Sequence, residues 1–349
     1  MGFYISPAGL NRVLARLREE YDLFAPRRFE RGHAFSGMDQ VRYAPVTGIE
    51  EVVFDQKSAY SFKECLLPIT QNLFFFTEEQ VKVSNPPSKR RILFLRSCDI
   101  HSIKRLDAHY LGNGREDYYY RRIRQGIRIV LMGCRTPFES CFCTAMGTNR
   151  PDAYDMYIEA ADDGYLIDCK TPEWDRLFDE YPRETREVCP AFVNETTALT
   201  ETVDAIPEHL GPEAAALPLW DEYDSRCINC GRCNFVCPTC GCYTMQDIFF
   251  SDNGKAGERR RVWASCMVDG FTDVAGGGSY RQKNGQRMRF KVLHKILDFK
   301  KRFGYHLCVG CGRCDDICPE YISFSHIINT LNRITAASPG TPKGGTINQ

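Results

Sequence analysis

Two short apolar runs separated by a helical pattern stand out in the first half of the chain. Residues Ile92–Leu95 form the first run, which suits a buried strand, and Ile127–Met132 form the second. Between them, apolar side chains recur at helical spacing, at Ile100, Ile103, Leu106 and Tyr110. A strand, a helix and a strand in this order predict two neighbouring parallel strands that are joined by a right-handed crossover.

The sections before and after this unit carry weaker patterns. Ser6 is a typical N-cap residue, and apolar side chains then follow at helical spacing up to Leu17, so we predict a helix there. Val41–Tyr43 and Val52–Phe54 predict short strands, but we recognise no chemistry in this front section. Further along, alternating apolar side chains over residues 156–168 predict a hairpin.

The C-terminal half contains one cysteine pattern twice, C-x2-C-x2-C-x3-C followed by proline. The first copy is Cys227, Cys230, Cys233, Cys237 and Pro238, and the second is Cys308, Cys311, Cys314, Cys318 and Pro319. This spacing is typical of bacterial ferredoxins, because three thiolates in one tight loop can reach three irons on one face of a cube. Zinc ribbons space their cysteine pairs differently, and neither copy has that spacing. We therefore predict two [4Fe-4S] clusters, with a zinc-binding interaction module as the alternative.

In two-cluster ferredoxins, the fourth cysteine of each copy reaches the cluster of the other copy. The predicted ligands are Cys227, Cys230, Cys233 and Cys318 for the first cluster, and Cys308, Cys311, Cys314 and Cys237 for the second. A long insertion separates the copies and holds three further cysteines, Cys240, Cys242 and Cys266. The first two could compete with Cys237 as a ligand, and the sequence leaves open whether any of the three binds iron.

The insertion is also rich in basic residues, and Arg287–Lys301 predicts a basic helix. Other basic residues are Arg259–Arg261, Arg281 and Lys283. They would offset the negative charge of reduced clusters, dock an acidic partner or simply form a solvated face. The sequence does not decide between these interpretations.

A further group of cysteines follows the two apolar runs of the first half. Cys98 and Cys134 come directly after the predicted parallel strands, and Cys141 and Cys143 lie in the adjoining loop. The carboxyl ends of parallel strands meet at one edge of a sheet, so all four cysteines should converge there. We predict a third [4Fe-4S] cluster on these four residues, with a zinc site or buried free thiols as alternatives. The neighbouring Asp99 would be a substitute ligand or, as we prefer, a loop cap.

Length, charge and cysteine usage limit the classes of protein to which the chain can belong. With 349 residues the chain is long enough for two domains. Its 45 basic residues balance its 45 acidic residues, so the net charge does not favour binding to nucleic acid. The chain has 18 cysteines, many of them at the spacing of cluster ligands, and we recognise no signal peptide. No apolar run is long enough to span a membrane. We therefore predict that the protein lies in the reducing cytoplasm.

The predicted fold class is α+β with α/β character. We place an N-terminal mixed α/β domain at 1–215, a two-cluster ferredoxin-like helical domain with the long insertion at 216–335, and a mobile tail at 336–349.

Over nearly its whole length the chain resembles the iron–sulfur electron-transfer subunit of anaerobic sulfite reductases. The segments that carry this resemblance are Arg96–Ile100, Cys141–Asn149, Tyr223–Cys227, Trp263–Met267 and Cys308–Asp316. The chain is similar, more distantly, to the beta subunits of cytoplasmic sulfhydrogenases, which share this two-part plan.

The resemblance implies an electron carrier rather than the sulfite-reducing site itself. In that family a flavin subunit oxidises NADH, this type of subunit relays single electrons, and a sirohaem subunit reduces sulfite to hydrogen sulfide. The family is usually described by two ferredoxin-type clusters, so the third cluster rests on the strand-end argument. The alternative that stays open is the beta subunit of a sulfhydrogenase or hydrogenase. We assign no catalytic residue to this chain.

Overall fold

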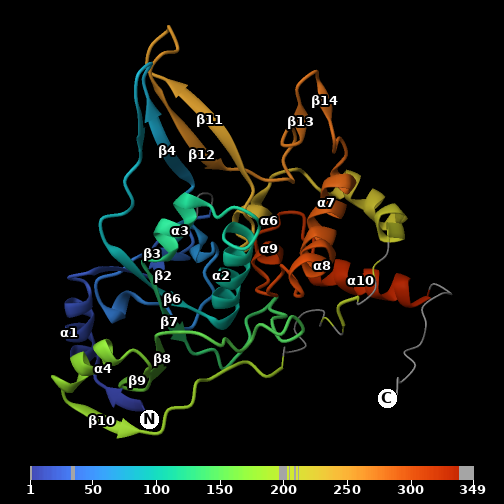
Figure 1. The fold of residues 1–349 in the computed structure, drawn as a ribbon. Coiled ribbons are helices and arrows are strands. Elements are labelled where there is room, and N and C mark those ends of the chain that lie inside the picture. The colour runs from blue at the N-terminus through green and yellow to red at the C-terminus, as the bar shows by residue number, and fades with distance from the viewer. Residues whose placement is uncertain are drawn as a thin grey trace, which may run out of the picture.

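A large mixed sheet forms the base of the molecule in the computed structural model, and the cysteine-rich part packs beside it (Figure 1). The structure describes residues 2–32, 36–195, 203, 205–207, 210 and 212–337. Most of the predicted tail lies outside these residues, and only its first two positions are described, as the end of helix α10.

The large sheet has eight strands in the order β10-β1-β9-β8-β7-β6-β2-β3. The strands are β1 (Gly2–Ile5), β2 (Tyr21–Phe29), β3 (Gln40–Pro45), β6 (Arg90–Leu95), β7 (Ile127–Met132), β8 (Met156–Ala161), β9 (Gly164–Cys169) and β10 (Arg183–Arg186). Strands β2, β6, β7 and β8 are parallel neighbours, whereas the outer strands pair antiparallel.

Helices cover both faces of this sheet. The helices are α1 (Pro7–Leu17), α2 (Ser97–Tyr110), α3 (Tyr118–Arg124) and α4 (Pro172–Asp179). Helices α1 and α4 bury their apolar sides in one core, and α2 and α3 contribute to a second core on the other face. The two apolar runs of the sequence are buried because both faces of their strands are covered.

Most elements predicted for this part are confirmed. The Ser6 hydroxyl accepts a hydrogen bond from the Gly9 backbone and caps α1, and β6, α2 and β7 form the predicted parallel unit. The strand predicted over Val52–Phe54 is wrong: Val53 donates one backbone hydrogen bond to Pro26, and no ladder continues from it. The patterns also miss β10, whose alternate positions carry no apolar side chains.

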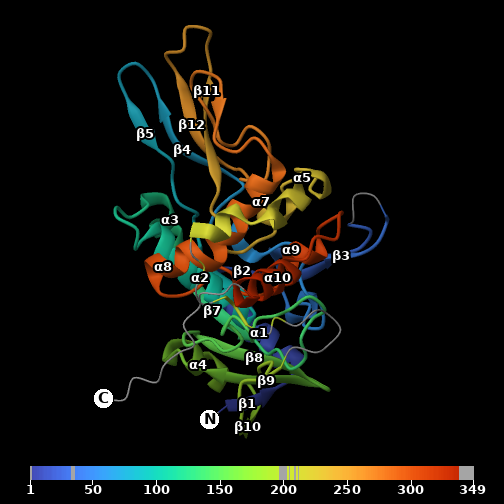
Figure 2. The same ribbon diagram turned by 90° about the vertical axis from the view of Figure 1, so that its right-hand side faces the viewer.

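A smaller sheet links the front section of the chain to the insertion. Its strands are β4 (Thr70–Phe76), β5 (Val81–Val83), β11 (Tyr243–Phe249) and β12 (Gly257–Trp263), in the order β11-β12-β4-β5. Strands β4 and β12 pair antiparallel, so two hairpins that are distant in sequence form one sheet. This sheet projects as an arm from the rest of the molecule in both views (Figures 1 and 2). The domain boundary near residue 215 stays a prediction.

The C-terminal part is helical around the cysteine loops. Its helices are α5 (Glu222–Arg226), α6 (Arg232–Phe235), α7 (Asn284–Leu293), α8 (Phe299–Phe303), α9 (Arg313–Asp316) and α10 (Phe324–Ala337), and a π-helical turn (His294–Asp298) joins α7 to α8. A small hairpin of β13 (Asp273–Val274) and β14 (Gly278–Ser279) precedes α7. The predicted α+β class is confirmed. No helix among the described residues has the length and apolar character needed to cross a bilayer.

Candidate iron–sulfur centres

Both cysteine loops have the same backbone shape. The residue before the second cysteine has a positive φ in each copy, 59° at Asn229 and 64° at Gly310. The residue after that cysteine is a left-handed glycine, Gly231 with φ 71° and Gly312 with φ 70°, and each glycine caps a short helix, α6 or α9. Glycine adopts this conformation without the strain that a Cβ would cause. The two copies therefore share a turn geometry as well as a spacing.

One cavity gathers the cysteines predicted for the first cluster. Its lining includes Cys227, Cys230, Cys233, Cys318, Met267, Met288, Lys291, Cys314 and Ile322. The Lys291 side chain is buried beside these sulfurs. Burial alone would lower the pKa of Lys291, but the sulfurs of Cys233 and Cys314 outweigh burial and raise it. A buried cation of this kind favours the thiolate form that a cluster requires.

The second predicted set surrounds the buried ammonium of Lys295. Its Nζ donates hydrogen bonds to Cys237 Sγ at 3.2 Å and to Thr239 Oγ1 at 3.3 Å. Electrostatic interactions connect Cys237 with Cys308 and Cys311, although Cys237 belongs to the other motif copy. Burial raises the pKa of Cys308 to about 12 and that of Cys311 to about 11. The structure thus brings the fourth cysteine of the first copy to the second copy.

Another cavity gathers the cysteines predicted for the third cluster. Its lining includes Cys98, Cys134, Cys141, Cys143, Lys57, Arg96, Phe138, Cys311 and Arg313. Cys98 lies in the first turn of α2, directly after β6, and Cys134 follows the end of β7. The four cysteines therefore meet at the edge of the sheet at which the sequence places them. That they bind a cluster stays a prediction.

The loop over residues 138–148 rests against the second ferredoxin-type loop. The backbone N–H of Phe142 donates to the Gly310 carbonyl at 2.8 Å. A Cβ at Gly310 would lie 2.5 Å from the Phe142 oxygen, so only glycine allows this approach. In consequence Cys311, a predicted ligand of the second cluster, also lines the cavity of the third set.

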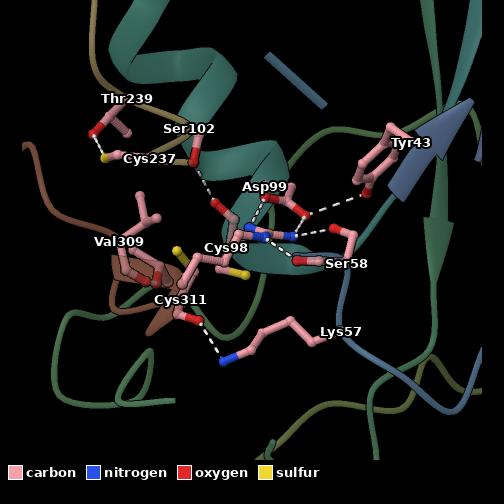
Figure 3. A network of polar contacts seen from close by, with 12 residues as sticks. Tyr43, Lys57, Ser58, Cys98, Asp99, Ser102, Cys237, Thr239, Val309 and Cys311 are labelled. Carbon is pink, nitrogen blue, oxygen red and sulfur yellow. Dashed lines mark hydrogen bonds and ion pairs between the residues drawn. The ribbon is translucent and has the colours of Figure 1, made fainter. Parts of the chain in front are cut away.

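A buried ion pair joins the third cavity to helix α9. Arg313 binds Asp99 through two parallel contacts of 2.7 and 2.8 Å, and both side chains are almost completely buried. Ser58 accepts from Arg313 at its carbonyl and hydroxyl oxygens, and Tyr43 donates to Asp99 at 3.3 Å. Figure 3 shows Asp99 between the tyrosine ring and the Cys98 side chain. Asp99 is therefore neither a loop cap nor free to bind metal, because Arg313 occupies both carboxylate oxygens.

The front section, in which the sequence shows no chemistry, supplies several polar residues to these sites. Lys57 Nζ donates to the Cys311 carbonyl at 3.2 Å and to Ser140 Oγ at 2.8 Å (Figure 3 shows the first contact). Lys63 Nζ donates to the Cys240 carbonyl at 3.0 Å. Burial lowers the pKa of Lys63, and the Cys240 sulfur opposes this effect. A lysine in a weakly patterned segment gives no sequence signal of such a contact.

The basic residues of the insertion divide between two of the roles considered. Lys291 and Lys295 lie against cysteine sulfur, as expected for residues that offset cluster charge. Arg259 pairs with Asp247 on the exposed arm and belongs to a solvated face. The spacing of Lys291 and Lys295, one helical turn apart among apolar neighbours, is the signal that could have identified them.

The donor groups suit clusters better than single metal ions. Among the described residues, no three Cys, His, Asp or Glu side chains converge tightly enough to hold one ion. Zinc requires all its sulfurs at about 2.3 Å from one point. In an iron–sulfur cube the cysteines bind different irons, so their sulfurs lie further apart. Tight glycine loops, converging cysteines and buried lysines therefore fit [4Fe-4S] clusters and argue against a zinc module.

These features define the chain as an iron–sulfur electron-transfer protein. Residues 226–322 match the family described as a 4Fe-4S dicluster domain, which includes both cysteine motifs. The chain is 29% identical over 307 residues to sulfhydrogenase 2 subunit beta of Pyrococcus furiosus, which covers 83% of this chain and 88% of the relative. It is 21% identical over 126 residues to the F420-dependent formate dehydrogenase subunit beta of Methanocaldococcus jannaschii, covering 36% of this chain and 24% of that protein. No solved structure matches the chain significantly.

We expect the variant Lys295→Met to lower the reduction potential of one cluster signal. The buried ammonium favours the more negative, reduced state, so its loss makes reduction harder. A charge-assisted hydrogen bond contributes about 1.5–3 kcal/mol, and 1.4 kcal/mol corresponds to about 59 mV for one electron, so a fall of about 60–130 mV is expected. An EPR-monitored redox titration measures it. Lys301→Met, which changes an exposed lysine on α8, is the control, and equal potentials in both variants would contradict the assignment.

Proposed function

We propose that this chain is the electron-transfer subunit of a cytoplasmic anaerobic sulfite reductase. In the proposed complex, a flavin-containing partner oxidises NADH and a sirohaem-containing partner reduces sulfite to hydrogen sulfide. Bound iron–sulfur clusters supply one-electron transfer, and the protein supplies their positions and surroundings.

The observation that carries the proposal is the contiguity of the three cysteine sets. Cys314 lines the cavity of the first set although its motif belongs to the second, and Cys311 lines the cavity of the third. The sets therefore adjoin one another within a single chain. An arrangement of this kind suits a relay between two partner proteins better than it suits a single isolated redox site.

The chain's own residues prepare these sites for negative charge. Lys291 and Lys295 are buried against cysteine sulfurs, and Lys57 lies beside the cavity of the third set. Because the side chains around a cluster set its charge balance and exposure to water, they also set its potential. The residues thus tune the relay without taking part in bond-making chemistry.

The projecting arm supports the expectation of partner subunits. Strand β11 is an edge strand whose residues are all exposed. Large apolar side chains remain uncovered near it, including Phe249 at 56% and Phe250 at 61% of their surface. Exposed apolar patches of this kind are typical of surfaces that bind other proteins.

A second candidate function is that of a sulfhydrogenase beta subunit, which passes electrons to or from a nickel–iron site. The similarity to sulfhydrogenase 2 subunit beta over 83% of the chain favours it. Both candidates make this chain an electron carrier and differ in the catalytic partner.

Anaerobic isolation of the native complex tests the proposal. We expect about twelve irons per copy of this chain, because each of its three predicted cubanes holds about four. A sirohaem absorption should co-purify, together with NADH-dependent sulfite reduction. Nickel in place of sirohaem would select the hydrogenase alternative. Colourless, iron-free protein from oxygen-free cells would contradict both candidates.

A further inference from the structure

One buried arginine contacts every segment that supplies a cysteine to the third set. Arg96 is the N-cap residue of helix α2 and stands two positions before Cys98. Its Nη1 donates to the carbonyl of Gly133, the residue before Cys134, at 3.3 Å. The centre of its guanidinium lies 4.5 Å from the centre of the Phe138 ring, in the loop that holds the other two cysteines. The side chain therefore links the three pieces of chain on which the set depends.

The front section of the chain fixes the orientation of this side chain. Arg96 Nη2 donates to the carbonyls of Phe54 at 2.5 Å and of Gln56 at 3.3 Å. Arginine presents several N–H donors in one rigid plane, so contacts in several directions leave it little freedom. Arg96 is 6% exposed and lines the cavity that gathers the four cysteines. Its charge is thus held at the wall of that cavity.

No salt bridge among the described residues neutralises Arg96. Arg313 also lines the cavity, but it is paired with Asp99. Lys57 lines the cavity as well, but its ammonium pairs with Asp316 at 2.5 Å. The hydrogen bonds of Arg96 described above go to carbonyl oxygens, which carry no net charge. A buried charge without a counter-ion is strongly unfavourable, so an anion is expected beside this guanidinium.

Helix α2 adds positive potential at the same place. Its first residues, Ser97 and Cys98, line the cavity, so the helix begins there. The first N–H groups of a helix carry a partial positive charge and favour anions. The acidic residue of the first turn, Asp99, does not offset this charge, because Arg313 binds its carboxylate.

We propose that Arg96 is the positioning residue of the third cluster and supplies the positive charge that favours its reduction. This inference rests on the third [4Fe-4S] cluster of the proposed function. A cubane with four thiolate ligands is an anion and becomes more negative when it accepts an electron, so a fixed cation beside it stabilises the reduced state. Lys291 lines the cavity of the first set and Lys295 donates to a sulfur of the second, and Arg96 gives the third set the corresponding cation.

The test is an EPR-monitored redox titration of the full chain, purified without oxygen in its native complex. The signal that is missing from Cys141→Ser/Cys143→Ser identifies the third cluster. Arg96→Gln keeps an N–H donor for the carbonyls but removes the charge. Reduction of the third cluster should then become roughly tenfold less favourable, which lowers its one-electron potential by about 59 mV.

Two further variants separate the charge from other effects. Arg96→Lys keeps the charge and should keep the wild-type potential. Arg135→Gln is the matched control, because Arg135 directly follows Cys134 but is exposed and pairs with Glu159. It should leave the potential of the third cluster unchanged.

An unchanged potential in Arg96→Gln, or a lower one in Arg96→Lys, would overturn the inference. If Arg96→Gln loses the cluster, Arg96→Lys decides: it should retain about four irons in the third set, and loss from both variants would overturn the role of the charge. If Cys141→Ser/Cys143→Ser lost no signal, the third cluster and this inference would fall while the first two clusters remained. Iron-free wild-type protein would instead contradict the proposed function, so the two failures are distinguishable.

Discussion

Replacing Cys141 and Cys143 by Ser is expected to remove about four irons per chain while the other clusters stay bound. Both residues line the cavity that also holds Cys98 and Cys134, and serine is a poor ligand for iron in such a site. Iron and sulfide quantification measures the loss directly. The visible absorption should fall in proportion rather than disappear.

The control for this variant is the double change of Cys169 and Cys189 to Ser. Cys169 ends β9 and Cys189 is exposed, and neither lines the two cavities that gather the cysteines of the first and third sets. Its iron content should equal that of the wild type. If Cys141→Ser/Cys143→Ser also retained all its iron, the third cluster would have to be abandoned and the four residues regarded as buried thiols.

The variant Asp99→Leu should lower the free energy of unfolding by about 3–5 kcal/mol, because it leaves the Arg313 guanidinium buried without its partner. Asp99 is on α2 and Arg313 on α9, so the loss also weakens the contact between the large sheet and the second cysteine motif. Thermal unfolding of the iron-loaded chain, followed by visible absorption, reports the change.

A second variant separates charge from packing. Asp99→Leu combined with Arg313→Met should recover much of the lost stability, since removing both charges together leaves neither of them unpaired. Glu116→Leu, which removes the exposed pair with Arg121, should cost at most about 1 kcal/mol. Equal stability of Asp99→Leu and Glu116→Leu would show that the buried pair is unimportant.

Local patterns predicted the parts of the fold whose signal lies within one stretch of sequence. The parallel unit of β6, α2 and β7 follows from two apolar runs and a helical stripe, and it places Cys98 and Cys134 at one sheet edge. The two cysteine motifs likewise carry their own turn geometry. In these cases a few neighbouring residues determine the local structure.

The remainder depends on contacts between distant segments, which a single sequence does not reveal. The pairing of β4 with β12 joins residues 70–76 to 257–262, and the sequence of neither strand indicates which strand it pairs with. Lys63 reaches Cys240, and Arg313 reaches Asp99, across similar separations. Sequence patterns show that such polar residues exist, but only the fold shows that they are buried together.

The pairing of β4 with β12 also constrains the order in which the chain can fold as it is synthesised. At roughly 5–20 residues per second, the ribosome needs on the order of 10–40 s after making β4 to complete β12. During that interval Phe74 and Phe76 have no strand to pair with on one side, and such unpaired strands are prone to aggregate. Newly made chains should therefore depend on chaperones, and iron cannot be inserted at the second motif until Cys318 has been synthesised.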